Sequence, residues 1–182
     1  MACFSDDFAH LFPFWHQGLL HLQQKGLYHG NICLQSLLLV EDETLVISDL
    51  GRSVRVPFTD PFNAGHVTDA SESECRRLIR NVPNRGGAKY QAPEVGSGAF
   101  DAFSSDVWSA GVVLFHLLTG ISLFRRAKTS DTVFKFVSKG NLRVLIESWG
   151  IALSEEACDL LQNMFWRNPR DRINLNEIME HP

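Results

Sequence analysis

Two short polar segments contain the residue types in this chain that could do chemistry. The first, residues 29–36, reads H-G-N-I-C-L-Q-S, and the second, D-L-G at residues 49–51, begins thirteen residues after Ser36. The carboxylate of Asp49 could bind a hard cation or cap a turn. The amide of Asn31 could hydrogen-bond a hydroxyl group but could not accept its proton. Either segment alone is a weak signal, because such short motifs occur at many turns.

Three further motifs follow these two segments along the chain. They read Y-x-A-P-E at residues 90–94, D-x-W-S-x-G at residues 106–111 and N-P-x-x-R at residues 168–172. In order and spacing the five motifs resemble the large lobe of protein kinases, in which the first two read H-R-D-x-x-x-x-N and D-F-G. Residues 177–182 resemble the last helix of Ser/Thr kinases of the calcium/calmodulin-dependent type. The resemblance covers essentially the whole chain. It implies one domain, residues 1–182, with the mainly α (α+β) fold of a protein-kinase-like C-terminal lobe.

The resemblance assigns roles to several charged residues. Asp49 matches the position that binds Mg²⁺ bridging the nucleotide phosphates. Asp106 matches a buried acid that accepts backbone N–H bonds from the catalytic loop, and Glu94 and Arg172 match an ion pair. These last two roles are architectural, so they predict the fold and say nothing about turnover.

By the same resemblance, the residues that would transfer a phosphoryl group are replaced. Asn31 stands in place of the catalytic Asp, Cys33 in place of the catalytic-loop Lys, and Ser36 in place of the second metal-binding Asn. Gly30 replaces the Arg that receives an activation-loop phosphate, and Gly87 replaces a Thr that hydrogen-bonds the catalytic Asp and Lys. A positioned base alone is typically worth about 10²–10⁴-fold in rate. Catalytic groups that act as a unit do not contribute additively, so one loss can remove most of the rate.

We therefore expect a pseudokinase, a binding or scaffolding module in which Asp49 and Ser36 bind Mg²⁺ and ATP weakly or not at all. The alternative is a Ser/Thr protein kinase that transfers the ATP γ-phosphoryl group to protein hydroxyls once a small lobe completes it. In that case Asn31 would position the substrate, since phosphoryl transfer depends strongly on orientation. A degenerate product without stable function is the third interpretation. A redox role for Cys33 is disfavoured because no basic residue stands beside it in the sequence.

The small lobe of a kinase has no counterpart in this sequence. Neither a G-x-G-x-x-G loop nor a V-A-I-K-like strand precedes Gly26. The chain is expected to be a fragment or a large lobe alone, with its upper face covered by a small lobe or another chain. The activation segment, from Asp49 to Glu94, has 46 residues and is longer than is usual in the family.

Composition narrows the class of partner and the compartment. The 182 residues are 45% hydrophobic and 21% charged with a net charge of −4, which is typical of a soluble globular domain. Basic pairs are too few for a nucleic-acid surface, and no apolar run reaches the roughly 20 residues that a bilayer requires. The four cysteines form no CxxC pair, so reduced thiols and a cytoplasmic or nuclear location are expected. We therefore expect the chain to bind a protein partner or a protein substrate, and to bind neither nucleic acid nor a membrane.

Apolar spacing predicts a mainly helical chain with one small hairpin. The hairpin is expected over residues 36–47 and a long loop over residues 57–87. Ser104 or Ser105 is the expected cap of a central buried helix that Gly120 ends. Trp108, Trp149 and Trp166 are expected in the core. The predicted helices cover residues 5–25, 105–118, 131–139, 154–166 and 174–180.

Overall fold

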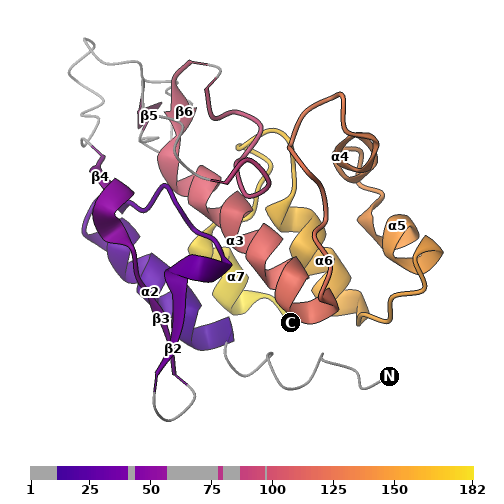
Figure 1. Cartoon of the computed structure of the whole chain (residues 1–182), viewed down its shortest axis with the longest axis horizontal. Helices are drawn as coiled ribbons and strands as arrows, with labels where there is room; N and C mark the ends of the chain where they lie inside the picture. Colours follow the sequence, from indigo (N-terminus) through magenta and orange to yellow (C-terminus); the bar gives the residue numbers. More distant parts are fainter. Residues whose placement is uncertain (1–11, 41–43, 57–77, 80–86, 97) are drawn as a thin grey trace.

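The computed structural model describes residues 12–40, 44–56, 78–79, 87–96 and 98–182. Helices dominate this part of the chain and surround α3 (Ala102–Thr119), which runs through the middle of the molecule (Figure 1). The other α-helices of these ranges are α2 (Phe12–Gln24), α4 (Thr132–Val137), α5 (Leu142–Ser148), α6 (Glu155–Met164) and α7 (Leu175–Glu180). The mainly helical prediction is confirmed for the described residues.

Three short antiparallel pairs accompany the helices. The predicted hairpin is formed by β2 (Leu37–Val40) and β3 (Thr44–Ile47), with Leu37 opposite Ile47 and Leu38 opposite Val46. The sequence did not predict the pairing of β1 (Leu27–Tyr28) with β4 (Val54–Arg55), or of β5 (Leu78–Ile79) with β6 (Phe100–Asp101). Two-residue strands are too short to show an alternating pattern, so periodicity cannot reveal them. Most of the loop predicted over residues 57–87 lies outside the described residues.

Helix α3 forms the centre of the core because it is apolar on nearly all sides. Its N-cap is Asp101, whose Oδ1 accepts the Ser104 N–H at 3.0 Å, so the predicted cap at Ser104 or Ser105 is wrong. Gly120 ends the helix with a left-handed φ of 71°, as predicted. By length and composition alone α3 could cross a membrane, but 61% of it is buried, as expected for a core helix.

An aromatic cluster joins α3 to the C-terminal helices. Trp108 is fully buried, with its ring centroid 5.3 Å from that of Phe165 and 5.6 Å from that of Phe124. Gly111 permits this packing, since a Cβ there would lie 3.0 Å from both Met164 and Phe165. The prediction of a core position is wrong for Trp149, which is 39% exposed.

Three of the smaller helices begin at residues whose side chains cap the first turn. Asp131 caps α4, Ser154 caps α6, and Asn174 caps α7 in a capping box with Glu177. Helix α5 was not predicted, and its N-cap Asn141 makes no side-chain cap bond. Of the predicted helix 5–25, residues 5–11 lie outside the described part.

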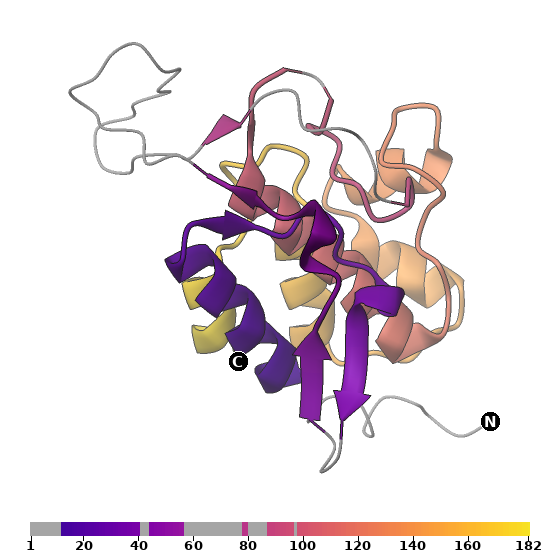
Figure 2. The same cartoon turned by 60° about the vertical axis from the view of Figure 1, so that its left-hand side comes forward.

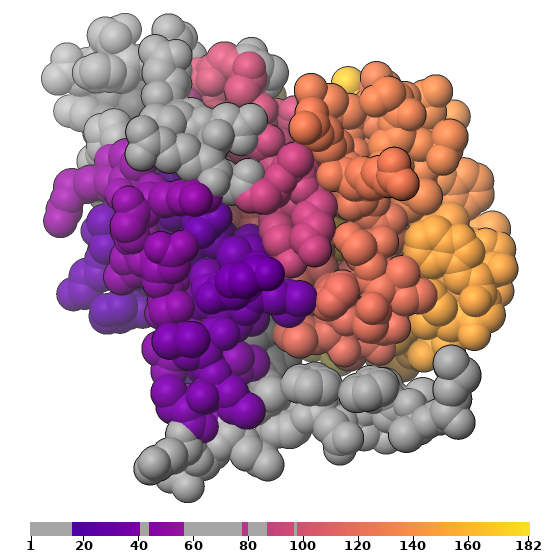
Figure 3. All heavy atoms as spheres, viewed as in Figure 1, coloured from indigo at the N-terminus to yellow at the C-terminus, as the bar shows by residue number. Residues whose placement is uncertain are grey.

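The β2–β3 hairpin packs one face on α2 and leaves the other exposed. Figure 2 shows the hairpin beside α2, and the side chain of Ile47 approaches the backbone of Gly18 there. On the opposite face Leu38 is 50% exposed and Val46 is 42% exposed. The hairpin region, residues 87–96 and the chain after α3 follow one another across one face of the molecule (Figure 3).

Candidate active site

The loop that carries the first polar segment is fixed to α3 by one buried carboxylate. Asp106 accepts the backbone N–H of His29 at 2.8 Å and that of Gly30 at 3.0 Å. Burial raises the pKa of Asp106 to about 7, although the two N–H bonds oppose the shift. The role predicted for Asp106 is therefore confirmed.

His29 links this loop to the chain before Asp49. Its buried ring accepts the Asn31 N–H at Nδ1, at 3.2 Å, so Nε2 carries the proton and donates to the Ser48 carbonyl at 2.9 Å. Burial lowers the pKa of His29, which favours this neutral form. The hydrogen bond of His29 to Ser48 therefore holds residues 29–36 beside the start of residues 49–51.

Asn31 and Asp49 meet directly in the structure, although eighteen residues separate them. The Asn31 Nδ2 donates to Asp49 Oδ2 at 2.6 Å, while Arg52 Nη1 donates to Asn31 Oδ1 at 2.9 Å. The amide oxygen thus faces the cation and the amide nitrogen faces the carboxylate, which is the favourable orientation. We call this arrangement the Asp49–Asn31–Arg52 chain.

Two features of the Asp49–Asn31–Arg52 chain could not be taken from the motifs. Asp49 has a left-handed φ of 61°, which is uncommon for a non-glycine residue. Arg52, at the end of the 3-10 helix Leu50–Arg52, was not among the predicted site residues. The sequence signal for Arg52 is only its position next to D-L-G, which could have marked it as a neighbour of the site.

Among the described residues, the side chains of Ser36 and Cys33 form no hydrogen bond with Asp49, although the Ser36 carbonyl accepts the N–H of the neighbouring Ser48 at 2.7 Å. The Ser36 Oγ is buried, donates to the Cys33 carbonyl at 2.8 Å and accepts the Cys33 N–H at 3.0 Å. These bonds close the short 3-10 helix Leu34–Ser36. A metal role for Ser36 stays a prediction, and it would require this hydroxyl to leave the turn. The Cys33 side chain is also buried, as a small apolar group.

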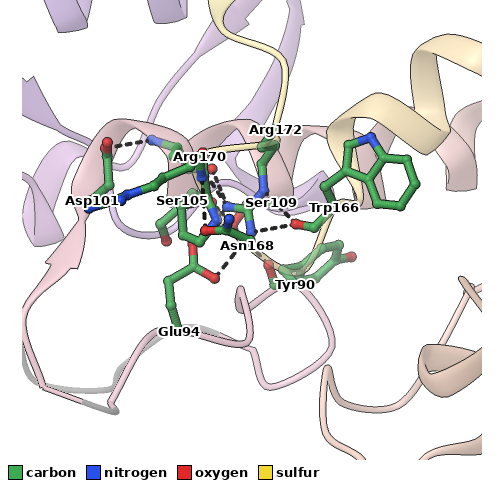
Figure 4. Close-up of polar contacts among 11 residues, drawn as sticks. Tyr90, Glu94, Asp101, Ser105, Ser109, Trp166, Asn168, Arg170 and Arg172 are labelled. Atoms are coloured by element: carbon green, nitrogen blue, oxygen red, sulfur yellow. Dashed lines mark hydrogen bonds and ion pairs between the residues drawn. The ribbon is translucent and has the colours of Figure 1, made fainter. Parts of the chain in front are cut away.

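The predicted ion pair between Glu94 and Arg172 is present and largely buried. Arg172 Nη1 lies 2.7 Å from Glu94 Oε1, and Nη2 lies 3.1 Å from Oε2 (Figure 4). The same guanidinium donates to the carbonyls of Ser104 and Trp166 and lies 5.0 Å from the Trp108 ring centroid. This pair fixes residues 90–94 to α3 and to the loop before α7.

The chemical capacity of the site follows from these donors and acceptors. The exposed Asp49 carboxylate can supply oxygen to a hard cation such as Mg²⁺. The Asn31 amide can orient a hydroxyl group but has no basic atom to take its proton. Among the predicted site residues, Asp49 is therefore the ligand available to a metal-bound nucleotide.

Comparison with known proteins agrees with these observations. A family model of the protein kinase domain matches residues 5–182. The chain is 32% identical to Serine/threonine-protein kinase stk11 of Xenopus laevis over 90% of the chain and 33% of that protein. It is 30% identical to Serine/threonine-protein kinase PLK4 of Drosophila willistoni over 91% of the chain and 18% of that protein. It is 32% identical to Calcium-dependent protein kinase 29 of Arabidopsis thaliana over 86% of the chain and 26% of that protein. The chain thus spans a third or less of the length of these relatives.

Proposed function

Since the chain belongs to the protein kinase family, we propose that it is a degenerate member that binds other proteins and has lost phosphoryl transfer. The observation that carries this proposal is the Asp49–Asn31–Arg52 chain. The amide of Asn31 occupies the position of the catalytic base, and its nitrogen already donates to Asp49. A hydroxyl group bound there would find a donor and a weak acceptor but no base.

A weak nucleotide site remains part of the proposal. Protein kinases use ATP with Mg²⁺, and Asp49 is the oxygen ligand that would hold the metal here. Asn31 competes with the metal for one carboxylate oxygen, because its hydrogen bond to Asp49 Oδ2 must be broken or shared. We expect this competition to weaken Mg²⁺–ATP binding.

A small lobe or another chain is proposed to cover the exposed side of the hairpin. Leu38, Val40 and Val46 are between 42% and 50% exposed, and Leu50, next to Asp49, is 49% exposed. Strand register places Leu38, Val40 and Val46 on one face of the hairpin, where they make an apolar surface.

A Ser/Thr kinase is the second candidate function. It is favoured by the contacts that position the loops of the site, because these contacts are present. His29 and Asp106 make the contacts that hold the loop at residues 29–36 in place, and the Glu94–Arg172 pair holds residues 90–94. In such an enzyme Asn31 would orient the substrate hydroxyl, and charge stabilisation would supply most of the rate.

Nucleotide binding is tested by the thermal stability of the purified protein with ATP in the presence and absence of Mg²⁺. Ligand at ten times its Kd stabilises a protein by about 1.4 kcal/mol, which raises Tm by a few degrees. We expect a rise that requires Mg²⁺ and disappears in Asp49→Ala. Glu180→Ala, which removes an exposed acid on α7, is the matched control and should keep the rise.

Loss of catalysis is tested separately by phosphate incorporation into a generic basic protein. The proposal expects no incorporation above a protein-free blank. Incorporation at rates usual for kinases that Asn31→Ala abolishes would contradict the proposal and favour the second candidate function.

A further inference from the structure

Arg52 places a positive charge beside the residue that would hold a metal-bound nucleotide. Its Nη1 donates to Asn31 Oδ1 at 2.9 Å, and the Nδ2 of the same amide donates to Asp49 Oδ2 at 2.6 Å. A single amide group therefore separates the guanidinium from the carboxylate that could bind Mg²⁺. Among the described residues, Arg52 is the only cation that contacts either Asn31 or Asp49.

The guanidinium of Arg52 has no partner of opposite charge in the part of the chain that the structure describes. Within that part, one of its five N–H groups is bonded, and the acceptor is the neutral amide of Asn31. The side chain is partly buried, and removing a charge from water is costly unless an anion compensates for it. The four other N–H groups are available to an anion, and a phosphate group matches the fork of a guanidinium.

The backbone fixes Arg52 at this place. The Ser53 N–H donates to the Leu50 carbonyl at 2.9 Å and closes the 3-10 helix that ends at Arg52. Strand β4 follows directly and pairs with β1, the strand that leads into residues 29–36. This strand pair joins the segment that carries Arg52 to the segment that carries Asn31. The contact between the two side chains is therefore supported by the fold on both sides.

The position at which the kinase family has a catalytic-loop Lys provides no positive charge here. Cys33 stands at that position, and its buried side chain acts as a small apolar group. Arg52 brings a cation to the same site from a different segment, directly after D-L-G. The charge that the first segment lacks is thus present in the second.

We propose that Arg52 binds a phosphate group of a Mg²⁺-bound nucleotide at this site and supplies the positive charge that Cys33 does not. The inference rests on the weak nucleotide site of the proposed function, in which Asp49 is the metal ligand. Hydrogen bonds from a guanidinium to phosphate are charge-assisted and stronger than bonds between neutral groups. Because Asn31 uses one N–H group of Arg52, their contact can persist while the others bind the phosphate.

The test is a fluorescence titration of methylanthraniloyl-ATP with the purified protein in excess Mg²⁺. We expect Arg52→Gln to weaken binding about tenfold, as for the loss of a charge-assisted hydrogen bond, and Arg52→Lys to retain most of the affinity. Arg55→Gln is the matched control, because it removes the charge of an exposed arginine on β4, and it should leave the affinity nearly unchanged. Tripolyphosphate with Mg²⁺, which lacks the nucleoside, should displace the probe from the parent protein and should compete less well in Arg52→Gln.

Urea denaturation of the same variants separates binding from folding. Arg52→Gln removes a charge that has no counter-ion among the described residues and keeps a donor for Asn31, so its urea midpoint should equal that of the parent protein. A weaker affinity that is accompanied by a lower urea midpoint, and that Arg52→Lys does not restore, would mean a structural role and would overturn the inference.

Four further results would overturn the inference. Equal affinity of the parent protein and Arg52→Gln, with binding still lost in Asp49→Ala, would reject Arg52 alone and leave the nucleotide site in place. Equal weakening by Arg55→Gln would mean general charge attraction. Tighter binding of a phosphoserine peptide than of Mg²⁺–ATP, lost in Arg52→Gln, would assign Arg52 to a phosphorylated protein segment. Binding of neither Mg²⁺–ATP nor Mg²⁺–tripolyphosphate to the parent protein would reject the nucleotide site and Arg52 together.

Discussion

At the scale of single residues, the site is explained by the match between Asn31 and its two neighbours. An amide has one end that accepts and one end that donates, and here these ends face Arg52 and Asp49 respectively. A carboxylate at residue 31 would suit Arg52 but would repel Asp49. The residue that cannot act as a base is thus the residue that satisfies both neighbours in the described conformation.

Asn31→Asp should therefore destabilise the protein at neutral pH. We expect a loss of about 0.5–1 kcal/mol in the free energy of unfolding, because the site is partly exposed and Arg52 offsets part of the repulsion. Urea denaturation of Asn31→Asp, Asp49→Asn and the double variant measures the coupling between the two positions. Asp49→Asn should remove the penalty of Asn31→Asp, and additive effects of the two changes would contradict this account.

Gly30 is the second residue whose identity is set by local geometry. Its φ is 71°, and a Cβ there would lie 2.8 Å from Tyr28 Cε1. We expect Gly30→Ala to lower the free energy of unfolding by more than the roughly 1–2 kcal/mol of left-handed strain alone. Gly120→Ala is the matched control, since Gly120 has the same φ of 71° with nothing within 4 Å of the added Cβ. Equal losses in the two variants would show that the contact with Tyr28 has no effect.

At the scale of elements, the Glu94–Arg172 pair holds residues 90–94 against α3 and the loop before α7. We expect Glu94→Gln to destabilise the protein by about 3–5 kcal/mol, because it leaves the fully buried Arg172 guanidinium without its counter-charge. Glu155→Gln is the control, because the Arg143–Glu155 pair has the same 2.7 Å distance but is exposed. That variant should lose less than about 1 kcal/mol in chemical denaturation. Similar losses from both changes would mean that the burial of the pair is unimportant.

The contact of α3 with the loop at His29 and Gly30 predicts a pH dependence. The carboxyl of Asp106 has a pKa of about 7 in the folded protein against an ordinary value of 3.8. Between these values the folded state binds more protons than the unfolded state, so the contribution of Asp106 to stability is fully present below about pH 4 and is lost as the pH rises through 7.

The measurement for this dependence is the free energy of unfolding of the parent protein and Asp106→Asn at several pH values. The difference between them removes the contributions of other groups, such as His29, whose lowered pKa acts in the opposite direction. We expect the stability of the parent protein to fall relative to Asp106→Asn as the pH rises from about 4 to about 7. Parallel curves for the two proteins would contradict the raised pKa.

At the scale of the whole molecule, the features predicted from sequence are those that leave a periodic or motif signal. The long buried helix α3, the β2–β3 hairpin and the Glu94–Arg172 pair belong to this class. The β5–β6 pair and Arg52 do not, because each depends on residues that meet only in three dimensions. The Asp101 cap is a local contact with Ser104, and it was missed because Ser104 and Ser105 are also residue types that cap helices. The single large-lobe domain over residues 1–182 stays a prediction.

The same distinction applies to the candidate site. The sequence indicated Asn31 and Asp49, because their motifs follow in the order of the kinase family, and the structure places them in contact. It could not reveal that the Ser36 hydroxyl closes a turn, since side-chain direction depends on the local backbone. Residue types at a motif position therefore indicate candidates, and the geometry decides which of them can act together.

The exposed apolar face of the hairpin gives a prediction for the molecule as a whole. Leu37 packs against the core, whereas the next residue, Leu38, is 50% exposed beside Val46. Leu38→Gln should therefore change the free energy of unfolding by less than about 0.5 kcal/mol, while Leu37→Gln should cost about 2 kcal/mol or more.

If the face is covered by another chain, sedimentation velocity of the purified protein should show concentration-dependent association that Leu38→Gln reduces. Val144→Gln, at a 54% exposed apolar residue of α5, is the control. An equal effect of Val144→Gln, or a protein that remains monomeric at every concentration, would exclude self-association through the hairpin and leave a different polypeptide as its cover.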